Sequence, residues 1–141
     1  MQAALARPES KRVLYLGGPI DLQEHNGRYH EFHTEINWKG MGITPYCPLC
    51  ECQGLTDEQC MEQNMLIVRR AWLALFDLRT HSVGTPIEMF LRCWVHSRPA
   101  ILIGSERSMF IRQTIDRFPN TYLVPNRTIA IDKIQEILIN G

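Results

Sequence analysis

The segment from Ser82 to Glu88 combines the residue types in this chain that are best suited to chemistry. Its sequence, Ser-Val-Gly-Thr-Pro-Ile-Glu, follows an apolar run over 71–78 and precedes an apolar-periodic stretch over 88–96. These flanks predict a buried strand that leads into a helix. Backbone N–H groups at a helix N-terminus favour anions, Gly84 lets a ligand approach the backbone, and Glu88 adds an acid. The segment therefore predicts chemistry on a phosphorylated or polyhydroxylated small molecule.

Strand and helix patterns alternate along the whole chain. We expect strands over 12–16, 43–47, 71–78, 99–103 and 122–124, and helices over 28–39, 56–70, 86–96, 105–117 and 128–139. This alternation predicts an α/β fold, doubly wound and flavodoxin- or Rossmann-like, with a five-stranded parallel sheet and helices on both faces. Pro45 favours an edge position for the second strand. Ligands in such sheets bind at the carboxyl ends of the strands.

Length and charge narrow the class of protein. The chain has 141 residues and a formal net charge of +0, which predicts a single domain over 12–141 after a flexible tail over 1–11. No basic stripe is present, so we expect no nucleic-acid partner, and no apolar run reaches membrane-spanning length, so we expect no membrane partner. The first residues lack a signal-peptide pattern, which favours a cytoplasmic protein.

Four of the five cysteines lie close together, at Cys47, Cys50, Cys52 and Cys60. A Cys-x2-Cys spacing is common in zinc and iron–sulfur sites, but a second such pair or a histidine pair is missing. A metal site and a disulfide remain alternatives. Because disulfides are rare in reducing compartments, we expect reduced, metal-free thiols, with Cys50 and Cys52 in a loop over the strand ends.

Four segments match a known enzyme family in order and spacing. They are 13–19, 44–48, 63–65, and 82–88 followed by 98–103. On these residues the chain resembles the nucleoside 2-deoxyribosyltransferase-like superfamily, which includes the 2'-deoxynucleoside 5'-phosphate N-hydrolases. The resemblance implies cleavage of the N-glycosidic bond of a (deoxy)nucleoside or its 5'-monophosphate, with transfer to water or to another base. It implies no cofactor and no metal, a small-molecule nucleoside or nucleotide substrate, and a homodimer or higher homo-oligomer.

The resemblance also implies catalytic roles for Glu88, Tyr15 and Asn64. Glu88 would be the nucleophile or would stabilise an oxocarbenium-like transition state, and Tyr15 would orient it through a hydrogen bond. Asn64 occupies a position where many hydrolases carry Asp. An amide transfers no proton near neutral pH, so general-acid catalysis there is in doubt, and Asp77 is the nearest substitute acid. A surface glutamate at the start of a helix and a core tyrosine are the structural alternatives for Glu88 and Tyr15.

Ser82 bears on which substrate is bound. The monophosphate hydrolases of the family carry Ser at this position, whereas many transferases carry Asp. Since Ser donates to a phosphate without adding negative charge, it favours a 5'-monophosphate; an ordinary loop serine is the alternative. The complete set of expected substrate-binding residues is Gly17, Gly18, Ile20, Asp21, Asp77, His81, Ser82, Gly84 and Thr85.

Two functions from other classes remain open. Asn64 in place of an acid, together with the cysteine-rich stretch over 47–60, is compatible with a non-catalytic nucleotide-binding or sensing module of the same fold. A metal-stabilised binding protein is the third possibility, which a zinc assay distinguishes from the others.

Overall fold

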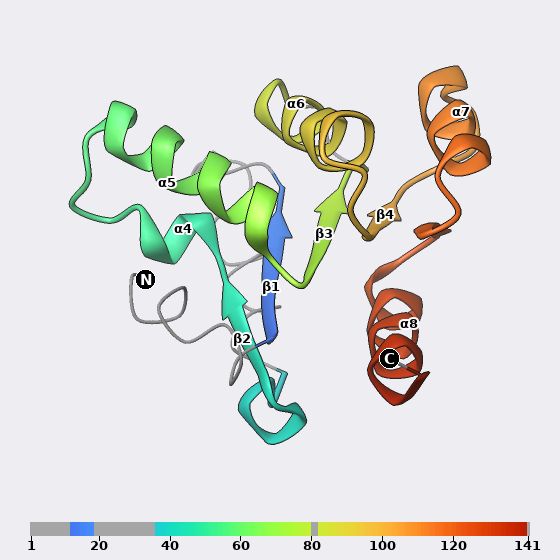
Figure 1. Ribbon diagram of the computed structural model, residues 1–141, viewed down its shortest axis with the longest axis horizontal. Coiled ribbons are helices and arrows are strands. Elements are labelled where there is room, and N and C mark those ends of the chain that lie inside the picture. The colour runs from blue at the N-terminus through green and yellow to red at the C-terminus, as the bar shows by residue number, and fades with distance from the viewer. Residues whose placement is uncertain (1–11, 19–35, 80–81, 141) are drawn as a thin grey trace.

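A five-stranded, all-parallel sheet organises the protein (Figure 1). The computed structural model describes residues 12–18, 36–79 and 82–140. The strands are β1 (Arg12–Gly17), β2 (Ile43–Tyr46), β3 (Leu73–Asp77), β4 (Ala100–Ile103) and β5 (Thr121–Val124). Their order in the sheet is β2-β1-β3-β4-β5. This order confirms the expected flavodoxin-like doubly wound fold, and β2, which contains Pro45, is an edge strand as predicted.

Helices cover both faces of the sheet. They are η2 (Lys39–Met41), α4 (Pro48–Glu51), α5 (Asp57–Arg70), α6 (Gly84–Phe90), the π-helix η3 (Leu91–Val95), α7 (Met109–Arg117) and α8 (Arg127–Asn140). Helices α5, α6 and α7 lie on one side of the sheet and α8 lies on the other (Figure 1). None of the helices in the described part of the chain is long and apolar enough to cross a membrane.

The core is divided by the sheet into two layers because successive strand residues point to opposite faces. On the side of α5–α7 the buried residues include Val13, Tyr15, Ala74, Phe76, Ile67, Met89 and Ile111. On the side of α8 they include Leu14, Leu16, Leu73, Leu75, Trp38, Ala130 and Ile134. Strands buried on both faces explain the nearly continuous apolar runs in the sequence. Tyr15 thus belongs to the layer that contains α6.

Two helix starts differ from those that the sequence predicts. Helix α6 begins at Gly84 rather than at Pro86 and continues into the π-helix η3, which ends at Val95. The N-cap of α7 is Ser108 rather than Ser105, because Ser108 Oγ accepts from the Ile111 N–H at 3.3 Å. Ser105 Oγ instead accepts from the Arg107 N–H at 3.2 Å, within the turn before the helix.

The segments that flank β2 also differ from expectation. The predicted helix over 28–39 falls largely outside the described residues, and its described end is a turn that leads into η2. Gly42 ends η2 with a φ of 74°, a conformation that favours glycine. Cys47 is the N-cap of α4 rather than a strand residue. In contrast, the helix expected from residue 56 is confirmed, and it opens on a capping box, a pattern that the spacing of Thr56 and Gln59 favours; the two residues bond reciprocally at 3.1 and 3.0 Å.

Candidate active site

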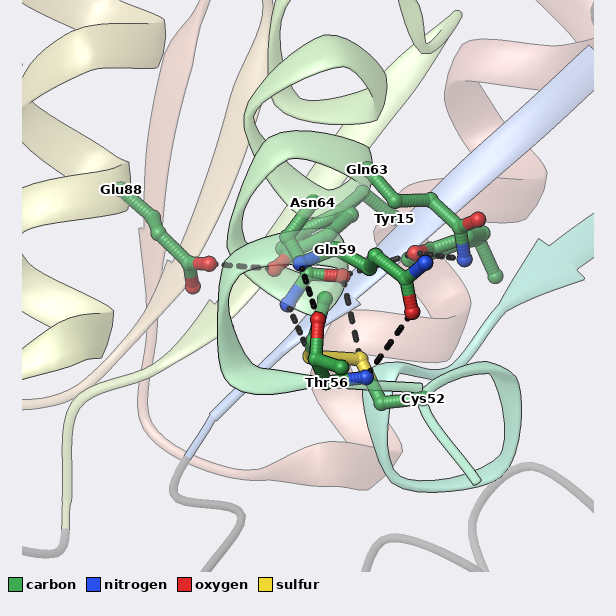
Figure 2. Close-up of a disulfide and its surroundings, with 9 residues drawn as sticks. Tyr15, Cys52, Thr56, Gln59, Gln63, Asn64 and Glu88 are labelled. Atoms are coloured by element: carbon green, nitrogen blue, oxygen red, sulfur yellow. Dashed lines mark hydrogen bonds between the residues drawn. A yellow bond between two sulfur atoms is a disulfide. The ribbon is translucent and has the colours of Figure 1, made fainter. Parts of the chain in front are cut away.

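A tyrosine from the middle of the sheet bonds a carboxylate from the helix above it. The Tyr15 hydroxyl donates to Glu88 Oε2 at 2.6 Å, although the two residues are 73 positions apart (Figure 2). The contact arises because β1 pairs with β3, and α6 returns across the same face of the sheet. The Tyr15 side chain is fully buried, whereas Glu88 is partly exposed. Two expected site residues are thus brought together.

The surroundings of Glu88 change its acidity. Burial of the carboxyl raises the pKa of Glu88 from 4.5 to about 7, and the hydrogen bond from Tyr15 acts in the opposite direction. Burial disfavours the charged form, while a donor to the carboxylate favours it. The carboxyl is therefore poised to be ionised or protonated near neutral pH, as is typical of groups that perform acid–base or nucleophilic chemistry.

A second hydrogen-bond chain contains Asn64. The Tyr46 hydroxyl donates to Asn64 Oδ1 at 2.7 Å and accepts from Gln63 Nε2 at 3.0 Å. Asn64 is buried, with 7% of its surface exposed. Burial raises the pKa of Tyr46 to about 12, so its hydroxyl keeps the proton that it donates.

The Tyr15–Glu88 pair and the hydrogen-bonded group around Asn64 are joined by two stacked tyrosine rings. Tyr15 and Tyr46 are direct neighbours in the parallel register of β1 and β2, and their ring centroids are 5.6 Å apart with planes 18° from parallel. Sequence analysis did not assign Tyr46 or Gln63 to the site. The available signal was a tyrosine in each of two apolar strands, preceding the Gly-Gly turn in one and Cys47-Pro48 in the other.

The cysteine prediction is wrong for one pair. Cys52 and Cys60 form a disulfide with their Cα atoms 5.3 Å apart (Figure 2). Cys52 ends α4 and Cys60 lies in the first turns of α5, so the exposed connection between these helices folds back and brings the sulfurs together. Cys47, Cys50 and Cys93 keep their thiols, and Cys50 lies on α4 rather than in a loop. In the described residues no group of three metal-ligating side chains is found.

Asp77, at the carboxyl end of β3, is engaged by a neighbouring cation. Arg79 Nε donates to Asp77 Oδ1 at 3.0 Å and Nη2 donates to Oδ2 at 2.8 Å. The Arg79 backbone N–H also donates to Oδ1, at 3.1 Å. Both carboxylate oxygens of the buried Asp77 are thus used in a bidentate pair. Asp77 therefore bonds the residues that follow β3, as an acid at the end of a strand often does.

Two adjacent hydroxyls and an open position lie where the loop after β3 enters α6. Ser82 Oγ and Thr85 Oγ1 are 3.4 Å apart, Ser82 is half-buried and Thr85 is buried. Gly84 is exposed, and a Cβ at this position meets no atom of the described residues within 4 Å. The described residues therefore leave room beside Gly84 for another group.

Gly17 has a packing role beside Tyr15. A Cβ at Gly17 would lie 2.5 Å from Phe76 Cδ1 and 3.0 Å from Tyr15 Cε1. The glycine thus lets the two aromatic rings close over β1. Gly18, which follows, is half-buried, while Ile20, Asp21 and His81 lie outside the described residues.

Comparison with known proteins finds similarity at the level of the fold. No protein-family model matches the chain, and no curated protein sequence matches it. A solved structure described as "2-desoxiribosyltransferase from Leishmania mexicana" matches with a TM-score of 0.56 and 15% sequence identity, over 72% of this chain and 70% of that chain. The two proteins share a fold. The nucleoside 2-deoxyribosyltransferase-like fold expected from the sequence is thereby confirmed.

Proposed function

We propose that this protein cleaves the N-glycosidic bond of a nucleoside or nucleoside 5'-monophosphate and transfers the sugar to water or to a second base. The observation that carries the proposal is the hydrogen bond from Tyr15 to Glu88 at 2.6 Å, within a fold shared with a deoxyribosyltransferase. This hydrogen bond joins an oriented carboxylate to the carboxyl-terminal half of a strand in the parallel sheet, and α/β enzymes bind their ligands at the carboxyl ends of such strands.

In the proposed reaction Glu88 acts as the nucleophile in its ionised form. Its carboxylate attacks the anomeric carbon, and the C–N bond to the base breaks through a transition state with oxocarbenium character. The base leaves with the electron pair of that bond and is protonated. Water or another base then attacks the anomeric carbon, gives up a proton to solvent and releases Glu88 as carboxylate. The pKa of about 7 keeps a substantial ionised fraction at neutral pH.

Tyr15 and Asn64 have supporting roles in this proposal. The Tyr15 hydroxyl fixes one oxygen of Glu88 and leaves the other oxygen for the sugar. Asn64, whose Oδ1 already accepts from Tyr46, offers an N–H to the sugar or the base. Because an amide supplies no proton, the leaving base takes its proton from another source, which we assign to solvent.

Release of free base is the direct test of the proposal. Purified protein is incubated with a panel of nucleosides and their 5'-monophosphates, and the products are separated by chromatography. Glu88→Gln removes the nucleophile with little change in size, so we expect base release to fall by several orders of magnitude. Glu62→Gln, on the exposed surface of α5, is the matched control and keeps the wild-type rate. Near-wild-type turnover by Glu88→Gln refutes the assignment.

The acceptor is identified by adding a second base to the same reaction. Formation of a new nucleoside shows transfer, whereas formation of free sugar or sugar phosphate shows hydrolysis.

We also propose that Ser82 contacts the 5' end of the substrate. Its half-buried hydroxyl lies beside the open position at Gly84 and is neutral, so it suits a phosphate. Ser82→Asp places a like charge beside that phosphate, so KM for monophosphates rises much more than KM for nucleosides. Ser82→Ala is the control, since it removes the hydroxyl without adding charge. Equal losses for both substrate classes exclude a phosphate contact at Ser82.

The specific observation that favours a second function is the amide at Asn64. A binding or sensing module of the same fold needs hydrogen bonds to a nucleotide but no proton donor. Such a module binds substrates without releasing base, so calorimetric binding of a nucleotide with unchanged nucleotide recovered afterwards would establish it.

We propose that a second copy of the chain covers the exposed apolar side chains of α6 and α7. Ile87 on α6 and Met109 on α7 are 54% and 69% exposed, and Val83, just before α6, is 75% exposed. The partly exposed rings of Phe90 and Phe110 stack between the two helices. Exposed apolar side chains gathered on neighbouring helices favour an interaction site. Ile87→Glu should convert an oligomer to a monomer in analytical ultracentrifugation, whereas Ile139→Glu, at the far end of α8, should not. A wild-type monomer excludes this contact.

A further inference from the structure

The Asn64 carboxamide lies between a tyrosine on one side and the disulfide on the other. Tyr46 donates to Oδ1, and Nδ2 donates to Cys60 Sγ at 3.5 Å. Cys52 Sγ lies 3.8 Å from Oδ1. Because a sulfur in a disulfide carries no hydrogen, this last approach is a packing contact. Figure 2 shows the disulfide directly beside Asn64.

These contacts fix the rotation of the carboxamide. The Tyr46 hydroxyl accepts from Gln63 and donates its single proton to Asn64 Oδ1. The Cys60 sulfur accepts from Nδ2. Because that sulfur has no hydrogen to donate, an amide turned by 180° would lose the bond to Cys60 and would set its N–H against the proton that Tyr46 now donates. The disulfide keeps that sulfur in place because it ties Cys60 to Cys52 at the end of α4.

Opening the disulfide would change the partners of Asn64 without unravelling the helix that carries it. Helix α5 begins at the capping box of Thr56 and Gln59, which lies between the two cysteines and does not depend on them. A reduced Cys52 would gain an S–H that can donate to Oδ1 in competition with Tyr46. A reduced Cys60 would be free to rotate away from Nδ2.

We propose that the Cys52–Cys60 disulfide is a redox-sensitive positioning device for Asn64. When closed, it holds the Asn64 carboxamide in one orientation toward the sugar or base, and when reduced, it releases the carboxamide and weakens substrate binding. The inference rests on the proposed function in so far as Asn64 contacts substrate.

The chemical step is a thiol–disulfide exchange with an external dithiol. One thiolate of the dithiol attacks Cys52 or Cys60, breaks the S–S bond and forms a mixed disulfide, and the other thiol sulfur of the reagent then displaces the protein thiol. Two electrons and two protons pass to the protein as two thiols, and the reagent becomes a disulfide. Both cysteines are partly exposed and so within reach of a reagent.

The neighbouring thiol is a poor internal reductant. Burial and the proximity of Cys47 raise the pKa of Cys50 to about 11, so it is almost entirely protonated at neutral pH. Since the thiolate is the attacking species, Cys50 exchanges slowly with the disulfide. This makes Cys50→Ser the matched control for changes at Cys52 and Cys60.

The test compares the full chain before and after treatment with dithiothreitol. Thiol titration of the unfolded protein verifies the starting state, which has three thiols among its five cysteines. One net hydrogen bond corresponds to a factor of about two to ten in binding, so we expect KM to rise by that factor on reduction, with a smaller change in kcat. The double variant Cys52→Ser, Cys60→Ser should behave as the reduced protein and ignore dithiothreitol. Cys50→Ser should respond as the wild type does.

Two further measurements separate positioning from a general structural effect. In Asn64→Ala the response of KM to dithiothreitol should vanish, because the effect acts through that carboxamide. The side-chain amide signal of Asn64 in nitrogen-15 NMR, assigned with the same variant, should shift on reduction in the absence of substrate. A shift without base release by any form supports the positioning device and refutes the proposed function. An unchanged Asn64 signal, or base release with equal KM in both redox states, overturns the inference.

Discussion

Removal of the Tyr15 hydroxyl is the sharpest probe of the electrostatics at Glu88. Tyr15→Phe keeps the buried ring, which packs against Tyr46 and Phe76, and removes only the donor to the carboxylate. That donor is what opposes the effect of burial on the pKa of Glu88, which is about 7 in the intact protein. The variant should therefore have a higher pKa at Glu88.

The size of the effect follows from the geometry. A hydrogen bond to a charged group contributes about 1.5–3 kcal/mol, and each pKa unit corresponds to about 1.4 kcal/mol. Because Glu88 is partly exposed and water can replace some of the lost bond, the lower end applies, which is about one pKa unit. At pH 7 the ionised fraction of Glu88 then falls from about one half to about one tenth.

The assay is the pH dependence of kcat/KM for base release between about pH 5 and pH 10. We expect the acidic limb to move upward by about one unit in Tyr15→Phe, with a roughly fivefold loss at pH 7 that diminishes as the pH rises. Tyr46→Phe removes a hydroxyl that does not bond Glu88, so it should leave the acidic limb in place. An acidic limb that stays where it is in Tyr15→Phe, or moves to lower pH, refutes the electrostatic argument.

Three other predictions concern stability and the binding loop. The pKa of Glu88 is higher in the folded state than in the unfolded state, so folding stability falls as the pH rises from about 4.5 to about 7. In urea unfolding, Glu88→Gln should therefore be more stable than wild type by about 1–3 kcal/mol at pH 8 and as stable as wild type near pH 4. The Cβ added by Gly84→Ala meets no atom of the described residues within 4 Å, so this variant should leave the melting temperature unchanged or higher while raising KM if substrate occupies that space; an unchanged KM would show that substrate does not occupy it. Arg92→Leu should cost about 3 kcal/mol or more, because the buried guanidinium donates to the carbonyls of Val68, Ala71 and Pro99, whereas Arg98→Ala, which removes one exposed donor, should cost about 1 kcal/mol or less.

The sequence was sufficient to predict the architecture of the sheet. Apolar runs that alternate with helix-period stretches require parallel strands with crossover helices, and Pro45 identified an edge strand. Tyr15 and Glu88 were paired through the family resemblance rather than through any property of the residues, because a contact over 73 positions depends on which strand neighbours β1. The capping box at Thr56 was predictable because its partners are only three residues apart.

The features that were not predicted depend on local geometry, because the same sequence pattern fits more than one local structure. Ser105 and Ser108 are both suitable N-caps, and only the path of the chain after β4 selects Ser108. The disulfide requires the connection after α4 to fold back so that Cys52 meets a helical residue eight positions later. Arg79 was missed because a cation two residues after Asp77 resembles ordinary loop composition until the bidentate geometry is known.

The Tyr15–Glu88 contact has a consequence for how the protein emerges from a ribosome. Strand β1 is made before both strands that flank it, β2 and β3, and gains its second neighbour only after residue 77 has been synthesised. Glu88 is made later still, when its partner Tyr15 has already left the exit tunnel. The contact therefore closes over a long loop. Its formation during translation would report that β1, β3 and α6 have docked, which requires the residues up to Val95 to have emerged from the exit tunnel.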